Sequence, residues 1–315
     1  MTAPLLALDF GGPKHAAAIT TPGSTTWTGY ERALAPPQSN AATDLDLMRS
    51  LIHKLLNGTT PEAIGVSFGG PVDFETGTVR LSHHVPGWEN VPLQQLLEAE
   101  YQVPVRVDND ANVAALGEHR FGAGQGYRDL LYITVSTGVG GGWILNGQPW
   151  RGAAGMAGEI GHTIADPQGA LCLCGKRGCV ERLASGPYLA MQVREWLAEF
   201  PQQGSLLRSI VADLEQLTAQ HISQAALQGD DLAKRAIERS AWALGVGIGN
   251  AANLINPQRF ILGGGVTKAG EQWWQMVRQT ARSTALPEVQ FEIVPAALGD
   301  DAPLWGAVAL ADFGF

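Results

Sequence analysis

The stretch at residues 5–20, LLALDFGGPKHAAAIT, decides the fold because it joins two apolar runs through a glycine turn. The first run ends at Asp9, the turn contains Gly11 and Gly12, and the second run covers residues 14–20. Apolar runs of this length, separated by a short turn that contains glycine, are typical of neighbouring strands. The sequence therefore predicts a strand, a glycine turn and a returning strand.

The same pattern of a buried strand that ends in glycines recurs further along the chain. The predicted strands and their glycines are 64–68 before 69–70, 130–135 before 138–142, and 260–262 before 263–265. Segments with apolar residues at helical spacing lie at 45–56, 91–101, 111–121, 187–199, 218–227, 232–255 and 303–312. Strands that alternate with helices predict an α/β fold in layers.

These glycines also suggest a function, because ligands of open α/β sheets bind beyond the carboxyl ends of the strands. Exposed backbone N–H groups there meet anions without a side chain in the way. A single glycine run can equally be a tight turn and nothing more, but four such runs indicate phosphate binding. The chain has neither GxGxxG leading from a strand to a helix nor GxxxxGK[ST], so Rossmann and P-loop folds have no support.

All three cysteines lie in the run CLCGKRGC, and a histidine precedes the first of them by ten residues. Cys172, Cys174, Cys179 and His162 form the four-ligand set of a tetrahedral zinc site. The glycines between the cysteines allow the tight turns that so short a loop needs. The alternatives are three reduced core cysteines beside an unrelated histidine, or a disulfide with one thiol left over. The clustering favours structural zinc.

The segment VDNDAN at 107–112 lies where a predicted strand gives way to a predicted helix. Asp and Asn at such a place cap the helix and favour the positive end of its dipole, which explains at least one of these side chains. A carboxylate in the first turn, beside a phosphate-binding loop, could instead accept the proton of an attacking hydroxyl, a role worth about 10²–10⁴ in rate. Asp110 is the candidate general base.

Three further polar residues lie beside the glycine loops. Asp9 is either a turn residue or a ligand of Mg²⁺, directly or through water. Lys14 either extends from a strand edge into solvent or meets phosphate as a point charge. Thr137 could donate its hydroxyl to a phosphate oxygen. Trp88 is the tryptophan expected near a ligand.

Composition restricts the partners and the location. A chain of 315 residues with 45% hydrophobic residues can fold as two domains without disulfides. Its formal net charge is −9 and its basic residues do not cluster, which argues against nucleic acid as a partner. A signal peptide and a run of 18 apolar residues are both missing, so no membrane partner is expected. Reduced cysteines committed to metal fit a cytoplasmic location.

Taken together, these motifs resemble the ROK family of bacterial sugar kinases, repressors and related open reading frames. LDFGGPK and TVSTGVGGG resemble its two phosphate loops, VSFGGPVD and VPGWENVPL its G-x-P-G and P-G-W segments, and ILGGGV its adenine-side loop. VDNDANVAALGE resembles the start of its catalytic helix, and GEIGH followed by CLCGKRGCVE is similar to its zinc signature. The resemblance extends from Leu5 to about Ala311.

The resemblance implies an α/β, actin-like ATPase (ribonuclease H-like) fold, in which two α/β domains close over a cleft that holds hexose and nucleotide. The smaller domain is expected at 1–118 and 301–315, with the first phosphate loop and the catalytic aspartate. The larger domain is expected at 119–300, with the zinc loop and the nucleotide-side loops. A homodimer or homotetramer is also expected from the resemblance.

The resemblance also implies roles for particular residues. Asp110 would take the proton of the sugar 6-hydroxyl as that hydroxyl attacks the γ-phosphate of ATP in line. The residues expected to contact the sugar are Gly70, Asn109, Asp110, Glu159, His162 and Glu181. His162 would use one ring nitrogen for zinc and the other for the sugar. The residues expected to bind Mg²⁺, phosphate or adenosine are Asp9, Gly11, Gly12, Lys14, Thr137, Gly138, Gly264 and Gly265.

Two departures from the family pattern bear on function. Pro13 stands where the family has threonine, which removes a hydroxyl and a backbone donor near the ATP phosphates. Two hydrogen bonds to charged oxygens are worth about 3–6 kcal/mol. The run Ser82-His83-His84 stands where the family often has asparagine, which could alter the sugar preference.

The first hypothesis is an ATP-dependent kinase of the glucokinase type, with glucose, ATP and Mg²⁺ as reactants and Zn²⁺ as a structural ion. An N-acetylhexosamine kinase of the same family is an alternative. A non-catalytic sugar sensor is another, because Pro13 would weaken the ATP site. A DNA-binding repressor is disfavoured, because eight residues ahead of Asp9 are too few for a helix-turn-helix.

Overall fold

The computed structural model describes residues 3–12, 14–82 and 85–312, and the chain divides into two compact units. The first unit comprises Met1–Tyr132, Gly142–Ala157 and Ala296–Phe315, and the second comprises Ile133–Gly141 and Gly158–Pro295. Residues 119–132 and 142–157 thus group with the first unit, although they were expected in the second domain. The domain boundaries expected from the sequence stay a prediction.

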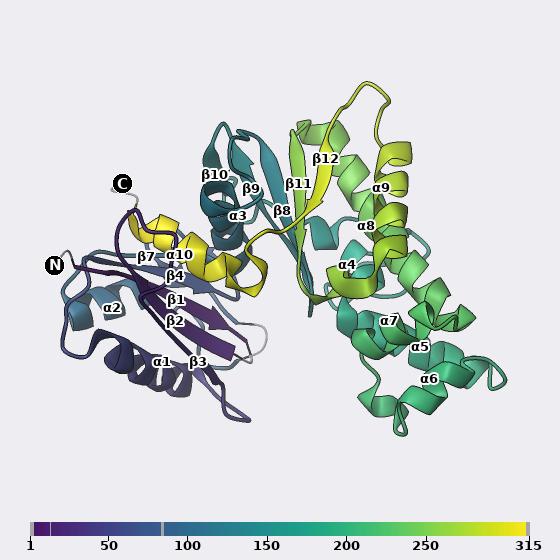
Figure 1. Ribbon diagram of the computed structural model, residues 1–315, viewed down its shortest axis with the longest axis horizontal. Helices are drawn as coiled ribbons and strands as arrows, with labels where there is room; N and C mark the ends of the chain where they lie inside the picture. The colour runs from purple at the N-terminus through teal and green to yellow at the C-terminus, as the bar shows by residue number, and fades with distance from the viewer. Residues whose placement is uncertain (1–2, 13, 83–84, 313–315) are drawn as a thin grey trace. The chain divides into compact units, whose positions relative to one another are not determined.

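The first unit is built on a five-stranded sheet in the order β3-β2-β1-β4-β7 (Figure 1). Its strands are β1 (Leu5–Gly11), β2 (Lys14–Thr20), β3 (Gly29–Leu34), β4 (Ala63–Phe68) and β7 (Val105–Asn109). β1 pairs antiparallel with β2 and parallel with β4, and β4 pairs parallel with β7. The predicted pair of opening strands is confirmed, and the carboxyl ends of β1, β4 and β7 meet at one edge of the sheet.

The side chains of β1 alternate between two hydrophobic cores on opposite faces of this sheet. The helices that cover the sheet are α1 (Ala41–Leu56), α2 (Leu93–Tyr101), α3 (Asp110–Phe121) and α10 (Ala302–Asp312). Leu6, Leu8 and Phe10 pack in the core that contains α1 and α2. Leu5 and Ala7 pack on the other face, where Figure 1 shows α10. This period of two fixes the register of β1.

Trp88 is a core residue, so its expected place beside a ligand is wrong. Its side chain is 1% exposed and packs edge-on against the rings of Phe10 and Phe68. Its Nε1 donates a hydrogen bond of 3.1 Å to Oδ2 of Asp44, a buried carboxylate on α1. Oδ1 of the same carboxylate lies 2.9 Å from Nε2 of the buried His15.

Replacing Asp44 with alanine is expected to lower the free energy of unfolding by about 3 kcal/mol, because it leaves His15 and the indole N–H buried without their acceptor. Burial raises the pKa of Asp44, but hydrogen bonds from His15, Ser39 and Trp88 outweigh that effect and hold the pKa below its ordinary value of 3.8. The stabilisation should therefore be complete above about pH 4 and disappear as the pH falls further. Urea denaturation of the variant and of wild type at several pH values measures the difference in the free energy of unfolding.

The matched control for this measurement is Asp46→Ala, two residues along the same helix. Asp46 is exposed and pairs with Arg49 at 2.9 Å. Its removal should change the free energy of unfolding by less than about 1 kcal/mol. Equal effects of the two substitutions would contradict the assignment of Asp44 as a buried anchor of α1.

A second five-stranded sheet has the order β10-β9-β8-β11-β12. Its strands are β8 (Leu130–Val135), β9 (Val139–Leu145), β10 (Gln148–Trp150), β11 (Arg259–Gly263) and β12 (Glu292–Pro295). The glycine-rich segment 138–142 was expected to be a loop, and this expectation is wrong for residues 139–142, which belong to β9. At Gly142 the strand requires glycine, because a Cβ there would lie 2.3 Å from the carbonyl oxygen of Ala111 on α3. The glycine permits close approach of strand and helix.

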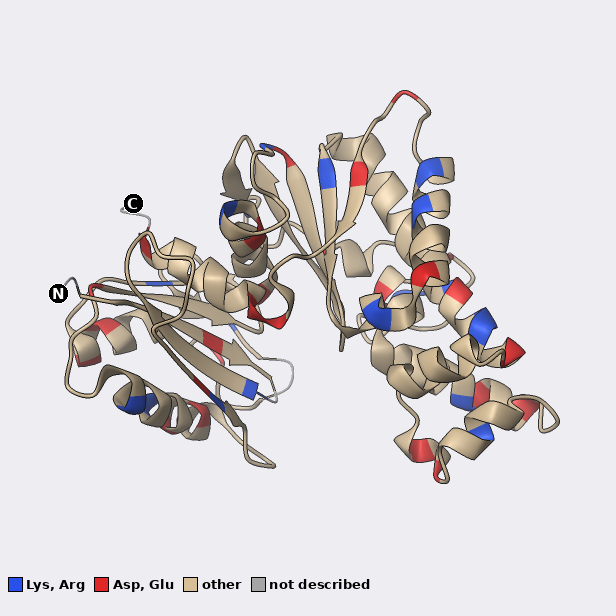
Figure 2. Ribbon diagram, viewed as in Figure 1, with Lys and Arg blue, Asp and Glu red and all other residues tan. Residues whose placement is uncertain are grey.

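The remaining helices belong to the second unit. They are α4 (Val180–Ala184), α5 (Gly186–Glu199), α6 (Ser205–Ile210), α7 (Ala219–Leu227), α8 (Asp231–Ile255) and α9 (Glu271–Thr284). α5, α7 and α8 were predicted, whereas α6, α9 and the strands β3 and β12 were not. Figure 2 shows acidic and basic residues interspersed along these helices, without a basic stripe on the described residues. Within residues 3–12, 14–82 and 85–312, no helix is long and apolar enough to cross a bilayer.

Candidate active site

In the first unit, the edge where β1, β4 and β7 end carries several of the residues expected to bind sugar and phosphate. The backbone N–H of Gly69 donates to the carbonyl oxygen of Phe10 at 2.9 Å, which joins the turns after β4 and β1. Nδ2 of Asn109 donates to the carbonyl oxygen of Gly70 at 3.1 Å, which joins the ends of β7 and β4. Three parallel strands thus bring together loops that are far apart in the sequence.

Asn109 takes the capping role that was open for the DNDAN segment. Asn109 is the N-cap of α3, and its Oδ1 accepts the backbone N–H groups of Ala111 at 3.0 Å and Asn112 at 3.4 Å. Asp110 is the first residue of the helix, and its Oδ1 accepts Nδ2 of Asn109 at 2.9 Å and the backbone N–H of Ala111 at 2.8 Å. The cap is therefore supplied by the amide, while the carboxylate is held on the first turn, half-exposed and at the positive end of the helix dipole.

Asp9 lies near the end of β1, and its Oδ1 accepts the hydroxyl of Ser67 on β4 at 2.8 Å. Burial raises the pKa of Asp9 from 3.8 to about 6, against the smaller opposing effects of the Ser67 hydrogen bond and of the charges of His15 and Arg32. A carboxylate that is held in a site unfavourable for its charge suits binding of a cation, which would stabilise the ionised form.

Replacing Asp9 with asparagine is expected to raise the Tm of the ligand-free protein at pH 7.5. Asparagine keeps the acceptor for Ser67 but removes the buried charge. Because the pKa of Asp9 is raised to about 6, the gain in the free energy of unfolding is at most about 3 kcal/mol. Because the folded-state pKa is raised, the gain should be absent below about pH 4, grow up to about pH 6 and stay constant above it.

Thermal denaturation of this variant and of wild type between about pH 3.5 and 8 measures the effect. Asp73→Asn is the control, because Asp73 forms a partly exposed pair with Arg80 at 3.1 Å. A Tm for the Asp9 variant that is equal to or below that of wild type at pH 7.5 would contradict the assignment of Asp9 as a strained functional carboxylate.

The first glycine turn contains the other residues expected to bind phosphate in this unit. No atom lies within 4 Å of a Cβ built on Gly12, so its backbone is accessible. Lys14, at the start of β2, is exposed. Pro13, His83 and His84 lie outside the described residues, so the two departures from the family pattern stay predictions.

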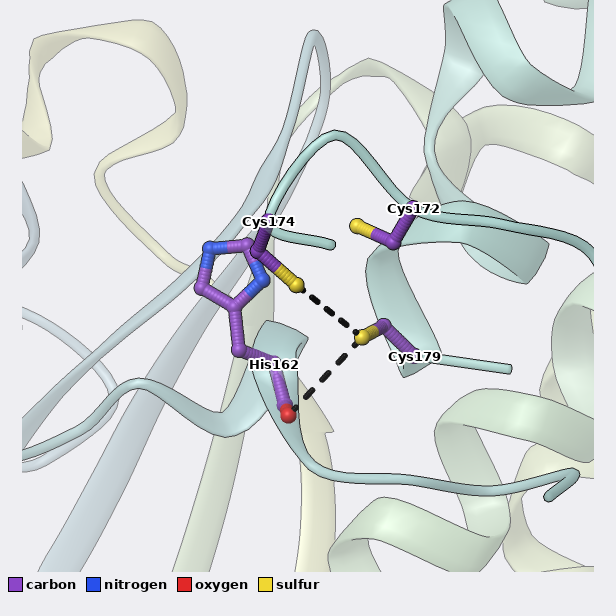
Figure 3. Close-up of side chains that lie close together, drawn as sticks. All are labelled: His162, Cys172, Cys174 and Cys179. Atoms are coloured by element: carbon purple, nitrogen blue, oxygen red, sulfur yellow. Dashed lines mark hydrogen bonds between the residues drawn. The ribbon is translucent and has the colours of Figure 1, made fainter. Parts of the chain in front are cut away.

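In the second unit, the four expected zinc ligands lie together (Figure 3). One nitrogen of the His162 ring and the sulfurs of Cys172, Cys174 and Cys179 all lie within 4.8 Å of one another. Tetrahedral zinc with Zn–S bonds of about 2.3 Å requires sulfurs about 3.8 Å apart, and Cys174 and Cys179 are 3.5 Å apart. Nδ1 of His162 is buried without a hydrogen-bond partner. The donor set and the orphaned nitrogen both fit zinc.

Local structure explains how so short a segment gathers four ligands. His162 ends the 3₁₀ turn η1 (Ile160–His162), and Cys179 immediately precedes α4. Gly178 has a φ of +67°, and a Cβ there would lie 1.5 Å from the carbonyl oxygen of Asp166, so only glycine fits. A hydrogen bond with the Lys176 backbone lowers the pKa of Cys174 to about 7, which favours the thiolate that a metal requires.

The zinc cluster is linked to the second glycine loop through α4. Glu181 is the second residue of that helix, and its Oε2 accepts the backbone N–H of Val139 at 3.0 Å. A Cβ on Gly138 would lie 2.7 Å from the same oxygen. Glu181 and Gly138 are therefore in contact, whereas Glu159, the residue before η1, is exposed. The structure thus brings one expected sugar residue against one expected phosphate residue.

A cavity of about 900 Å³ lies wholly within the second unit. It is lined by Thr137 and Gly265, both expected on the nucleotide side, and by residues of α5, α7 and the turn after β11. Gly264 does not line the cavity but belongs to the turn after β11. Only glycine fits at this position, because φ is +91° and a Cβ there would lie 2.4 Å from the carbonyl oxygen of Val135. The volume is that of a nucleotide-sized ligand site.

The walls of this cavity suit a nucleoside polyphosphate. Pro187, Leu217 and Val266 offer apolar surface for a flat base, and Arg194 and Lys268 supply positive charge. Arg194 and Lys268 were not predicted from the sequence, because Arg194 stands in a helix without a motif and Lys268 lies just beyond the ILGGGV motif. They become visible only when α5 and the turn after β11 come together.

This chain is similar to known proteins over almost its whole length. A model of the ROK family matches residues 5–313. The glucokinase of Halalkalibacterium halodurans is 38% identical, over 96% of this chain and 92% of that protein. A xylose repressor of Caldicellulosiruptor bescii is 34% identical, over 84% of this chain and 67% of that protein.

Among solved structures, a ROK family glucokinase from Streptomyces griseus in complex with glucose and AMPPNP is 34% identical. It superimposes with a TM-score of 0.84 over 98% of this chain and 99% of the other. The predicted α/β, actin-like ATPase fold is thereby confirmed. Because the family model spans almost every residue and the strand-end loops and the cysteine cluster carry the family's motifs, the chain belongs to the ROK family.

Proposed function

We propose that this protein is an ATP-dependent hexokinase that transfers the γ-phosphoryl group of ATP to the 6-hydroxyl of glucose. The observation that carries the proposal is the placement of Asp110, held by Asn109 on the first turn of α3 beside the Gly70 carbonyl. The likeness to the Streptomyces griseus glucokinase, whose structure contains glucose and AMPPNP, supports both substrates.

In the proposed reaction, Asp110 accepts the proton of the 6-hydroxyl while the oxygen attacks the γ-phosphorus and ADP leaves. Gly70 allows the sugar to approach the backbone. The other hydroxyls would be hydrogen-bonded by Asn109, Glu159, His162 and Glu181. Asn109 has a fixed orientation in this arrangement, because it is also the helix cap.

ATP would occupy the cavity of the second unit, with its base on the apolar wall. Phosphoryl transfer needs positioning and neutralisation of charge more than covalent chemistry. Mg²⁺, when bound, would supply that neutralisation, and Asp9 would hold it. The other residues proposed to bind phosphate or adenosine are Gly11, Gly12, Lys14, Thr137, Gly138, Gly264 and Gly265.

Zinc is proposed to be structural. His162, Cys172, Cys174 and Cys179 would hold it, and it would fix the orientation of His162 and of the first turn of α4 without entering the reaction. ATP and reduced thiols are available together in the cytoplasm, where we place the reaction. The dimer or tetramer expected from the family stays a prediction, which light scattering of the purified protein can test.

The test measures the release of ADP in the presence of ATP, Mg²⁺ and one sugar at a time: glucose, mannose, N-acetylglucosamine or N-acetylmannosamine. Calorimetry measures the binding of each sugar to the protein. The proposal requires glucose to give the highest kcat/KM. Preference for an N-acetylhexosamine would change the substrate. Sugar binding without ADP release for every sugar would favour a non-catalytic sensor.

A further inference from the structure

An ion pair in the first unit connects the end of β7, just before α3, to the segment after β10. Nε of Arg151 lies 2.7 Å from Oδ2 of Asp108, and the two side chains are 18% and 4% exposed. The Arg151 guanidinium carbon also lies 3.4 Å from the ring centroid of Phe74. The pair is therefore shielded from water on one side by an aromatic face, which strengthens it relative to a surface pair.

The second oxygen of Asp108 fixes the backbone and side chains around the proposed base. Oδ1 accepts the backbone N–H of Asn109 at 2.8 Å and Nδ2 of Asn112 at 3.2 Å. Asn109 in turn donates its Nδ2 to Oδ1 of Asp110 at 2.9 Å and to the Gly70 carbonyl at 3.1 Å. A continuous set of hydrogen bonds thus runs from Arg151 to the carboxylate of Asp110.

The charge of Arg151 matters as much as its geometry. Burial raises the pKa of Asp108, and the charge and hydrogen bond of Arg151 are the largest effects that oppose it. Asp110 is the carboxylate nearest to Asp108 along the chain. Without Arg151, a buried carboxylate without a counter-charge would stand two residues from the proposed base.

We propose that Arg151 is a positioning residue for phosphoryl transfer: through Asp108 and Asn109 it orients Asp110 toward the substrate hydroxyl, and its charge offsets that of Asp108 beside the base. This inference rests on the proposed function. A merely structural ion pair would instead affect the Tm without changing the pH dependence of turnover.

The test compares Arg151→Gln, Asp108→Asn and the double variant with wild type in the glucose-dependent ADP assay between about pH 5 and 9. Arg151→Gln is expected to lower kcat about 10- to 100-fold, since a misplaced base is that costly, and to leave KM for ATP within about twofold. The acid limb of the kcat profile should move to higher pH. An ionised Asp108 without its counter-charge raises the pKa of Asp110, and an Asp108 that burial keeps protonated must first ionise before it can hold Asn109 and Asp110 in place.

The double variant separates positioning from simple destabilisation. Asparagine at 108 keeps a carbonyl oxygen for the Asn109 N–H and removes the uncompensated charge, so the acid limb should return to the wild-type pH and kcat should partly recover relative to Arg151→Gln. Arg151→Lys keeps the charge and is expected to fold, but it lacks the planar donor group and should restore the acid limb without restoring kcat fully. The control is Arg49→Gln, which removes an exposed pair with Glu100 at 3.0 Å and should leave turnover unchanged.

The inference and the proposed function fail in different ways. If the wild-type protein phosphorylates no hexose, both the proposed function and this inference are contradicted. Active wild type, with Arg151→Gln equal to Arg49→Gln in kcat, would overturn the inference alone. A lower kcat with an unmoved acid limb, and additive losses in the double variant, would likewise assign Arg151 a structural role only.

Discussion

Asp110→Asn is expected to lower kcat for glucose phosphorylation by at least about a thousandfold, within the range that removal of a general base produces. The asparagine side chain can still accept the Asn109 amide but cannot take the proton of the attacking hydroxyl. Glucose should therefore bind with a dissociation constant within about tenfold of wild type, since hydrogen bonds to the sugar are mostly kept. The coupled assay for ADP and calorimetry with glucose measure the two quantities.

Asp231→Asn provides a matched control for this variant. Asp231 is the first residue of α8 and follows the N-cap Asp230, just as Asp110 is the first residue of α3 and follows the N-cap Asn109. Its removal costs the same small interaction with a helix dipole and should leave kcat unchanged. If Asp110→Asn keeps more than a few per cent of wild-type activity, the base has been assigned to the wrong residue.

Removal of zinc is expected to have the second largest effect. The purified protein should contain one zinc per chain by elemental analysis, and Cys179→Ser should lose it, because the variant would lack one of the four proposed ligands, a buried cysteine. Without zinc, His162 and the start of α4 lose their fixed positions, so kcat/KM for glucose should fall about 10- to 100-fold. The Tm should fall in parallel, because binding of a structural metal contributes to folding.

Leu173→Ser is the control in the same loop. Leu173 stands between two ligands but is 94% exposed, so its replacement should leave the zinc content, the Tm and kcat/KM unchanged. A Cys179→Ser variant that is free of zinc and yet fully active would contradict the structural role of the metal.

The sequence predicted those parts of the site that depend on neighbouring residues. The strand and glycine turn at residues 5–20, the DNDAN segment at the start of α3 and the cysteine run are each local, so residue type and spacing were sufficient. The two roles open for Asn109 and Asp110 could be separated only by geometry, because either side chain can cap a helix.

Features that depend on distant contacts were missed. Arg151 lies 43 residues from Asp108 and belongs to no motif, so nothing local links them. The helix α9 has the sequence EQWWQMVRQTARST, whose polar residues conceal the few buried positions, Trp273, Val277, Thr280 and Ala281. The glycines of β9 were predicted as a loop, because the close approach of the α3 backbone at Gly142 involves residues that are distant in the sequence.

The central claim is that this chain makes a sugar phosphate. The direct measurement is to incubate the zinc-containing protein with glucose, ATP and Mg²⁺ and to identify the products by ³¹P NMR and mass spectrometry. We expect glucose 6-phosphate and ADP in equal amounts, with no product from Asp110→Asn. Glucose that binds to the protein but is recovered without a phosphate, with ATP unconsumed, would contradict the claim.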